Sequence, residues 1–193
     1  MAVNQLRLLA VLLNPPRSTS GARTLGAVQR AAAVLGFGDL TIANLFADRT
    51  MDVIELNHLD SHSPWPANQS QIATQLSLAD GVLAGWGVAG ASGAFRCERA
   101  RRAQWLYTAA AAAGHETIWM VGGEPRHPSR WHQFVADAHG RTPGGSFEER
   151  LAHVLVAVPT PAPAAGRTPL PAAVSPRAQL GEKRPTRPVA RSL

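Results

Sequence analysis

The feature that most constrains the fold is an apolar run, residues 8–13, that ends abruptly at Asn14-Pro15-Pro16. An apolar run with no polar break is typical of a strand buried on both faces of a parallel sheet. Two prolines cannot continue a strand ladder, so the chain must leave the sheet there. Asn14 is therefore expected at the carboxyl end of a central strand, where open α/β sheets bind ligands.

The loop after this strand, Arg17-Ser18-Thr19-Ser20-Gly21, precedes a helical pattern. The backbone N–H groups of such a loop can cradle a phosphate. The alternative is a turn that leads into a helix N-cap, and the loop taken alone favours that alternative. It is not a P-loop, because the Gly-Lys-Ser/Thr signature is absent.

Three further short apolar runs predict strands, at residues 40–45, 81–86 and 117–121. Helical patterns alternate with them, at residues 26–35, 51–59, 69–78, 94–113 and 131–139, and a last helix is expected over 146–157 with Ser146 and Glu149 as a capping box. Strands that alternate with helices predict a parallel sheet with right-handed crossovers. We expect an α/β protein, a three-layer α/β/α sandwich with a four-stranded parallel sheet, in a domain spanning residues 1–158.

Four arginines crowd the first half of the long helix at 94–113: Arg96, Arg99, Arg101 and Arg102. Such a run usually marks a solvated face, which is the favoured interpretation here. Contact with DNA phosphates is the alternative.

The composition excludes several classes of protein. No apolar run approaches the ~20 residues of a membrane span, and no signal peptide is recognised, so the cytoplasm is the expected location. Cys97 is the only cysteine, which excludes an internal disulfide. Lys183 is the only lysine, which excludes a Schiff-base mechanism in the folded core. The histidines lack the spacing of metal ligands, so neither a metal nor another cofactor is predicted.

The net charge of +6 resides mostly in the last 35 residues. Five arginines and Lys183 stand there against Glu182, a net charge of +5, whereas residues 1–158 carry 13 arginines against 12 acids. Residues 159–193 are rich in Pro, Ala and Arg and are expected to be disordered, since they hold too little apolar surface to fold. This tail either holds nucleic acid loosely or is only a solvated extension.

Four loops are expected at one edge of the sheet, because the carboxyl ends of parallel strands lie together. They contribute Asn14, residues 44–46, Trp86-Gly87 and residues 124–130. Convergence of four polar or aromatic loops predicts a ligand site at this edge.

These loops, taken in order, resemble the motifs of the uracil-DNA glycosylase superfamily over residues 6–139. The first motif is matched by Asn14-Pro15-Pro16, and a second-strand motif is matched loosely by residues 44–50. Trp86-Gly87 and His127-Pro128-Ser129 match the ends of the third and fourth strands. Each motif is short, so the resemblance lies in their joint order. Within the superfamily, the chain is more similar to a branch of small bacterial proteins that resemble antiphage DNA glycosylases.

The resemblance implies a role for each loop residue. Asn14 would hold the attacking water by its carbonyl oxygen, although an amide is not a strong base. His127 would donate a hydrogen bond to the departing base; a purely structural histidine is the alternative. Asn44 would read the base edge. The remaining implied contacts are to substrate (Pro15, Ser18, Trp86 and Phe46) and to DNA phosphates (Arg17, Arg126, Ser129 and Arg130).

Two of these side chains have open alternatives. Phe46 either stacks on a flipped base or lies in the core. Glu124 either pairs with a neighbouring arginine, which is preferred, or serves as an acid.

The chain departs from the family pattern in ways that define the expected substrate. Uracil-specific members place a tyrosine soon after the first motif, whereas Tyr107 is the only tyrosine here and residues 18–21 are small. Pro16 stands where a glycine is usual. We expect a pocket open to a modified pyrimidine, with glucosylated 5-hydroxymethylcytosine in phage DNA as the candidate. Without a lysine in the body, hydrolysis would leave an abasic site in an uncut strand.

The expected protein is therefore a monomeric, monofunctional DNA glycosylase in antiphage defence that acts on double-stranded DNA. Two alternatives remain open. One is a hydrolase or transferase on free nucleotides that uses the same loops, and the other is a non-catalytic nucleic-acid-binding domain with a basic tail.

Overall fold

A computed structural model describes residues 5–16, 21–50, 53–58, 65–136 and 145–161. The chain divides into two units, residues 1–163 and 164–193. The described residues all lie in the first unit. The predicted tail falls almost wholly outside the described residues, as do Arg17 and Ser18.

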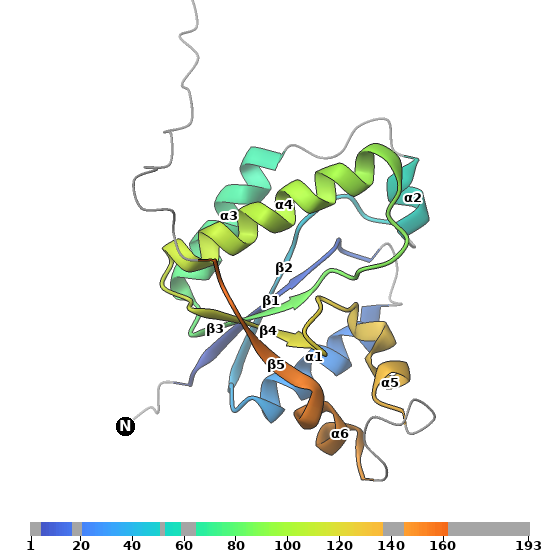
Figure 1. Cartoon of the computed structure of the whole chain (residues 1–193). Helices are drawn as coiled ribbons and strands as arrows, with labels where there is room; N and C mark the ends of the chain where they lie inside the picture. Colours follow the sequence, from blue (N-terminus) through green and yellow to red (C-terminus); the bar gives the residue numbers. More distant parts are fainter. Residues whose placement is uncertain (1–4, 17–20, 51–52, 59–64, 137–144, 162–193) are drawn as a thin grey trace, which may run out of the picture. The chain divides into compact units, whose positions relative to one another are not determined.

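The described part is a mixed α/β structure built on one sheet (Figure 1). Its elements, in chain order, are β1 (Arg7–Leu12), α1 (Ala22–Val34), β2 (Asp39–Asn44), α2 (Val53–Asn57), α3 (Trp65–Leu78), β3 (Gly81–Gly85), α4 (Gly93–Ala112), β4 (Thr117–Val121), the 3₁₀ helix η2 (Pro128–Arg130), α5 (Trp131–Phe134), α6 (Phe147–Val154) and β5 (Leu155–Pro159).

The predicted burial of the first strand on both faces is confirmed. Leu9 and Val11 of β1 belong to a core cluster shared with α3 and α4, whereas Leu8 and Ala10 belong to a second cluster shared with α1 and Leu151 of α6. All four residues are fully buried. Helices therefore cover both faces of the sheet, with α3 and α4 on one face and α1, α5 and α6 on the other (Figure 1).

The predicted four-stranded parallel sheet is wrong in one respect. The strand order is β2-β1-β3-β4-β5, and the four predicted strands are parallel as expected. A fifth strand, β5, pairs antiparallel with β4 from Thr117↔Pro159 to Val121↔Leu155. The sequence predicts a helix for the first three of these residues, 155–157, and assigns Pro159 to the tail.

The error lies in where the last helix ends. Its predicted start is confirmed: Ser146 accepts from the backbone N–H of Glu149, whose carboxylate accepts from the N–H of Ser146. The helix ends at Val154, after two turns, because the next residues complete the edge of the sheet. The β-branched Val156 and Val158 suit a strand, and Pro159 stands at its last position, where a lost ladder donor matters least.

Other helices also differ from their predicted bounds. Of the helix predicted at 131–139, α5 covers only Trp131–Phe134, and residues 137–139 lie outside the described ones. Both α1 and α3 begin four residues earlier than predicted. None of the helices in the described ranges combines the length and the hydrophobicity that a membrane crossing requires.

We expect β5 to be essential to the stability of the body. A chain that ends at residue 161 keeps the five-residue ladder, and its melting temperature should match that of the full chain. A chain that ends at residue 154 loses these backbone hydrogen bonds, each worth about 1 kcal/mol, and should melt at a clearly lower temperature. Equal melting curves for the two truncations would contradict this role of β5.

Candidate functional site

A cavity of about 1050 Å³ lies at the carboxyl ends of β1, β2 and β3. Its wall also includes the start of α1 and the segment from η2 to α5. The described site residues predicted from the sequence line this cavity together, with the single exception of Phe46: Asn14, Pro15, Asn44, Trp86, Arg126, His127, Ser129 and Arg130. The sheet edge therefore brings the first and the last predicted motifs to one space.

Asn14 is held by the amide nitrogen of its side chain. Nδ2 donates to Thr50 Oγ1 at 2.9 Å and to the backbone carbonyl of Pro15 at 3.1 Å. A carbonyl can only accept, so this contact fixes which end of the amide is the nitrogen. Oδ1 has no hydrogen-bond donor among the described residues, and Asn14 lines the cavity. A carbonyl-type acceptor is therefore available there to a water molecule.

His127 caps η2 with its imidazole. Nδ1 accepts from the backbone N–H of Ser129 at 3.3 Å and lies 2.9 Å from Ser129 Oγ. Since Nδ1 acts as an acceptor, the proton of the neutral ring is on Nε2. Burial lowers the pKa of His127, and the positive charge of Arg130 lowers it further. The ring is thus a neutral N–H donor near neutral pH.

The loops that follow β3 and β4 are tied to each other. Gly87 N donates to Pro125 O at 2.6 Å, and Trp131 Nε1, on a fully buried ring, donates to Arg126 O at 2.8 Å. Gly87 has a φ of +84°, and a Cβ built there would lie 3.4 Å from the Cβ of His127. A glycine therefore permits both the backbone turn and the close approach of His127.

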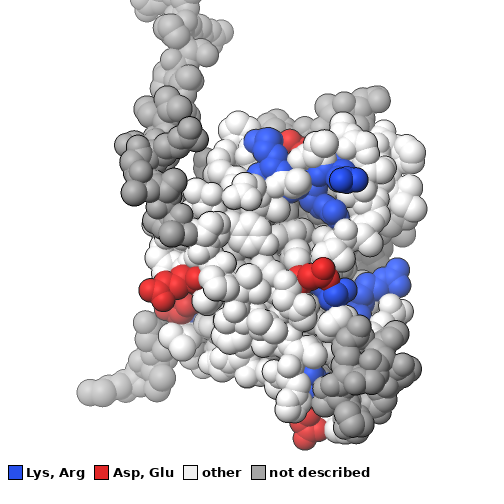
Figure 2. All heavy atoms as spheres, viewed as in Figure 1, with Lys and Arg blue, Asp and Glu red and all other residues white. Residues whose placement is uncertain are grey.

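Two arginines of the loop after β4 face different surroundings. Arg126 forms an ion pair with Glu124, the pairing that the sequence analysis preferred, and its guanidinium lies 4.2 Å from the centre of the Phe134 ring. Arg130 is exposed and donates to Gln133 Oε1 at 3.2 Å. Figure 2 shows positive side chains beside this loop and over α4. Arg130 is therefore the more accessible of the two to an anion.

Trp86 and Phe46 are less available than the sequence predicted. Trp86 lines the cavity but is only 4% exposed, with its ring edge-on to Tyr107 at 5.9 Å. Phe46 is fully buried and packs on Phe95, with ring centres 5.0 Å apart. Stacking of Phe46 on a base is therefore wrong, and the alternative of burial in the core holds. Its backbone N–H bonds to Leu13 O, which turns the side chain into the α3–α4 face.

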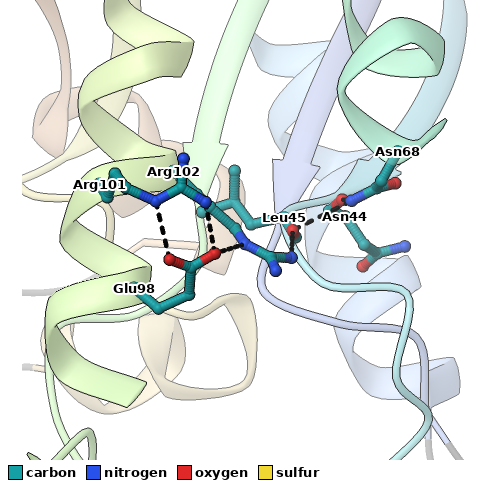
Figure 3. Close-up of polar contacts among 6 residues, drawn as sticks. All are labelled: Asn44, Leu45, Asn68, Glu98, Arg101 and Arg102. Carbon is teal, nitrogen blue, oxygen red and sulfur yellow. Dashed lines mark hydrogen bonds and ion pairs between the residues drawn. The ribbon is translucent and has the colours of Figure 1, made fainter. Parts of the chain in front are cut away.

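The arginine run of α4 is not simply a solvated face. Arg102 is 2% exposed, and its guanidinium lies 3.9 Å from the centre of the Phe46 ring and 4.7 Å from that of Trp65. It donates to Glu98 Oε1 at 2.7 Å and to the backbone carbonyl of Leu45 at 2.8 Å (Figure 3). The expectation of a solvated face is therefore wrong for Arg102, because its charge is satisfied inside the core.

The Arg102 contacts hold the end of β2. Asn68 Nδ2 donates to the carbonyls of Asn44 (2.8 Å) and Leu45 (3.0 Å), so the Leu45 carbonyl accepts two hydrogen bonds. Figure 3 shows the side chain of Asn44 pointing away from these contacts. The backbone that carries Asn44 into the cavity is thereby fixed from behind.

Arg99 orders the loop that follows β3. Its guanidinium reaches the carbonyls of Gly87 (3.4 Å), Val88 (3.2 Å) and Ala89 (3.3 Å), three successive residues of the cavity wall. Burial lowers the pKa of Arg99, and the neighbouring Arg96 lowers it further. Arg99 therefore shapes the loop instead of facing solvent freely.

A family model described as "Protein of unknown function (DUF1643)" matches residues 2–129. This chain belongs to the DUF1643 family. No curated protein and no solved structure matches it. The matched region includes the cavity residues after β1, β2 and β3 and ends at Ser129, whereas Arg130, α5, α6 and β5 lie beyond it.

Several cavity residues of this DUF1643 protein were missed by the sequence analysis. Thr50 is 4% exposed and holds Asn14; its place in the loosely matched second motif was the available signal. Leu25, Ile54 and Val88 line the cavity while remaining 41–57% exposed, and no local pattern marks them. Within the described ranges, no group of three or more His, Cys, Asp or Glu side chains is placed to hold a metal ion.

We expect His127 to titrate below its ordinary pKa of about 6.5, as followed by NMR of its ring protons. Arg130→Gln should raise the pKa only in part, because burial is the larger cause. Arg7→Gln, at the opposite edge of the sheet, should leave it unchanged. A titration at or above 6.5 in the unmodified protein would contradict a buried neutral ring.

The same shift has a consequence for stability. Below about pH 6.5 the unfolded chain binds a proton at His127 before the folded chain does. The free energy of unfolding should therefore fall as the pH drops from 6.5 through the lower folded pKa, and His127→Gln should remove that part of the acid loss.

Arg102→Gln should destabilise the protein by about 2–4 kcal/mol, since it removes a buried charge with its carbonyl and carboxylate partners. Arg101→Gln is the matched control: Arg101 also bonds Glu98, and with Arg102 it holds the pKa of that carboxyl at about 2, but its side chain is 56% exposed. Its loss should cost less than about 1 kcal/mol. Chemical denaturation measures both, and equal losses would contradict the buried role of Arg102.

Proposed function

We propose that this DUF1643 protein is a monofunctional DNA glycosylase that hydrolyses the N-glycosidic bond of a modified pyrimidine. The observation that supports it is the pairing of open groups on one cavity. Asn14 offers an acceptor oxygen and His127 a neutral N–H donor, and each is anchored by its other end. The proposal extends to a three-layer α/β/α fold like that of the uracil-DNA glycosylases, to which the loops are similar.

The proposed chemistry needs these two groups. Cleavage of the C1′–N bond leaves positive character on the sugar and negative charge on the base. Asn14 Oδ1 orients the water that attacks C1′, and the proton of that water passes to solvent. His127 Nε2–H stabilises the anionic base by a hydrogen bond. Its lowered pKa suits this role, because a neutral donor polarises the leaving group without itself changing charge.

The proposed substrate is an everted nucleotide of double-stranded DNA. A cavity of about 1050 Å³ exceeds what an unmodified pyrimidine needs, which favours a base with a bulky addition such as glucosylated 5-hydroxymethylcytosine in phage DNA. The exposed Leu25, Ile54 and Val88 offer apolar contacts to neighbouring bases. Arg130 suits a backbone phosphate, whereas Arg126 is already paired with Glu124. Antiphage defence by a cytoplasmic monomer is part of this proposal.

The test measures base release from glucosylated phage DNA and from an unmodified control, read as alkali-labile breaks. Asn14→Ala should lower the rate at least about a hundredfold by loss of the oriented water. His127→Gln should do the same by loss of the leaving-group donor. His153→Gln, an exposed histidine of α6, should keep full activity.

Each alternative function has its own result in this assay. Release from free nucleosides would favour a nucleotide hydrolase or transferase. DNA binding without release of any base would favour a binding domain. Full activity of Asn14→Ala would mean that the water is held elsewhere.

A further inference from the structure

The first half of α4 carries more positive charge than the fold neutralises. The helix has four arginines and a single acid, Glu98, which leaves an excess of three positive charges. Among the described residues, Glu98 is the one carboxylate that forms an ion pair with these arginines, and Arg101 and Arg102 share it. The other two arginines, Arg96 and Arg99, therefore have no carboxylate partner there. Figure 2 shows positive side chains gathered over this helix.

Arg96 has the fewest contacts of the four arginines. It lies in the first turn of α4 and is exposed, and its guanidinium has neither an ion pair nor a hydrogen bond within the described residues. The helix macrodipole favours acids in a first turn, yet α4 has no acidic residue there. Helix stability therefore does not account for a cation at this position, whereas an anionic ligand would.

Arg99 lies beside Arg96 and bonds only neutral groups. Residues three apart in a helix lie on the same face. Burial lowers the pKa of Arg99, and the nearby charge of Arg96 lowers it further. The guanidinium of Arg99 bonds backbone carbonyls at 3.2–3.4 Å, which are long hydrogen bonds to uncharged acceptors. Two like charges are thus held close together, an arrangement that a bound phosphate would stabilise.

These two arginines, the α4 pair, adjoin the main cavity, which is the one at the carboxyl ends of β1, β2 and β3. The carbonyls that Arg99 bonds belong to residues 87–89, and these residues form part of the cavity wall. Arg130 is exposed and lines the same cavity from η2. A polyanionic strand with one unit in the main cavity can therefore meet Arg130 at the cavity itself and the α4 pair beside the loop at 87–90.

We propose that Arg96 and Arg99 bind the phosphodiester backbone of the DNA strand whose target nucleotide enters the main cavity. Arginine binds phosphate oxygens through paired, charged hydrogen bonds. No partner among the described residues competes for the N–H groups of Arg96, and Arg99 adds its charge from a position that the loop fixes. The identity of the strand as DNA rests on the proposed function, whereas the excess of positive charge does not.

The test measures how tightly the full chain binds a labelled DNA duplex at several salt concentrations, without any assay of base release. Each phosphate that a protein neutralises adds about 0.9 to the slope of log K against log salt. Arg96→Gln should weaken binding about tenfold, because a charged hydrogen bond is worth about that factor, and should lower the slope by about one. It should leave the melting temperature no lower, since this side chain has no partner to lose.

The matched control is the double variant Arg7→Gln, Arg30→Gln, compared with Arg96→Gln, Arg99→Gln, which removes the same net charge. Arg7 pairs with Asp39 at the amino end of β1. Arg30 pairs with Glu148 and belongs to α1, on the opposite face of the sheet from α4 (Figure 1). The control should keep the slope of the unmodified protein, whereas the double variant of the α4 pair should lose about two. Equal losses would indicate a general charge effect and overturn the proposal.

The charge of Arg99 has to be separated from its contacts with the loop. Arg99→Lys keeps the charge without the guanidinium fork, so it should keep the slope, whereas Arg99→Gln should lower it by about one. No DNA binding by the unmodified protein, or an unchanged slope in Arg96→Gln, would overturn the proposal. DNA binding that depends on the α4 pair, without base release, would contradict only the glycosylase. Base release with an unchanged slope in Arg96→Gln would contradict only the α4 pair.

Discussion

The structure depends on the burial of β1 between two parallel neighbours. Its residues face a packed core on both sides of the sheet, so the strand cannot slip by one residue without exchanging its two faces. The register places Leu12 opposite both Asn44 of β2 and Gly85 of β3. Because Pro15 and Pro16 end the strand immediately afterwards, Asn14 has to leave the sheet beside Asn44 and Trp86. The position of the main cavity thus follows from the packing of an apolar strand.

The polar side chains of this cavity share a mode of attachment. Asn14 is held through its amide nitrogen, and His127 through Nδ1, so that each keeps its other polar atom for a ligand. The partner of His127 is Ser129, which is close in the chain. The side-chain partner of Asn14, in contrast, is Thr50, 36 residues later. The loop after β2 therefore orients the residue that follows β1.

The arginines discussed above fall into two kinds, those whose guanidinium groups have fixed partners within the fold and those with few or none. Arg102 lies inside the core, where Glu98, a backbone carbonyl and two aromatic rings surround it. Arg99 donates hydrogen bonds to three backbone carbonyls of a single loop. Arg130 and Arg96, in contrast, have few or no fixed partners among the described residues. Charges of the first kind stabilise the fold, and those of the second kind are suited to an anionic ligand.

The sequence by itself determined the first four strands, their parallel direction and the edge at which their loops meet, because these follow from local apolar runs and from the prolines that end them. It also determined the capping box of α6, which needs only two residues three apart. Tertiary structure alone decided the rest. The residues of β5 form a strand because β4 offers an open edge, and Phe46 is buried because α3 and α4 cover it. Arg102 is buried because Leu45, Phe46 and Trp65, from two distant segments, surround it together with Glu98 of its own helix.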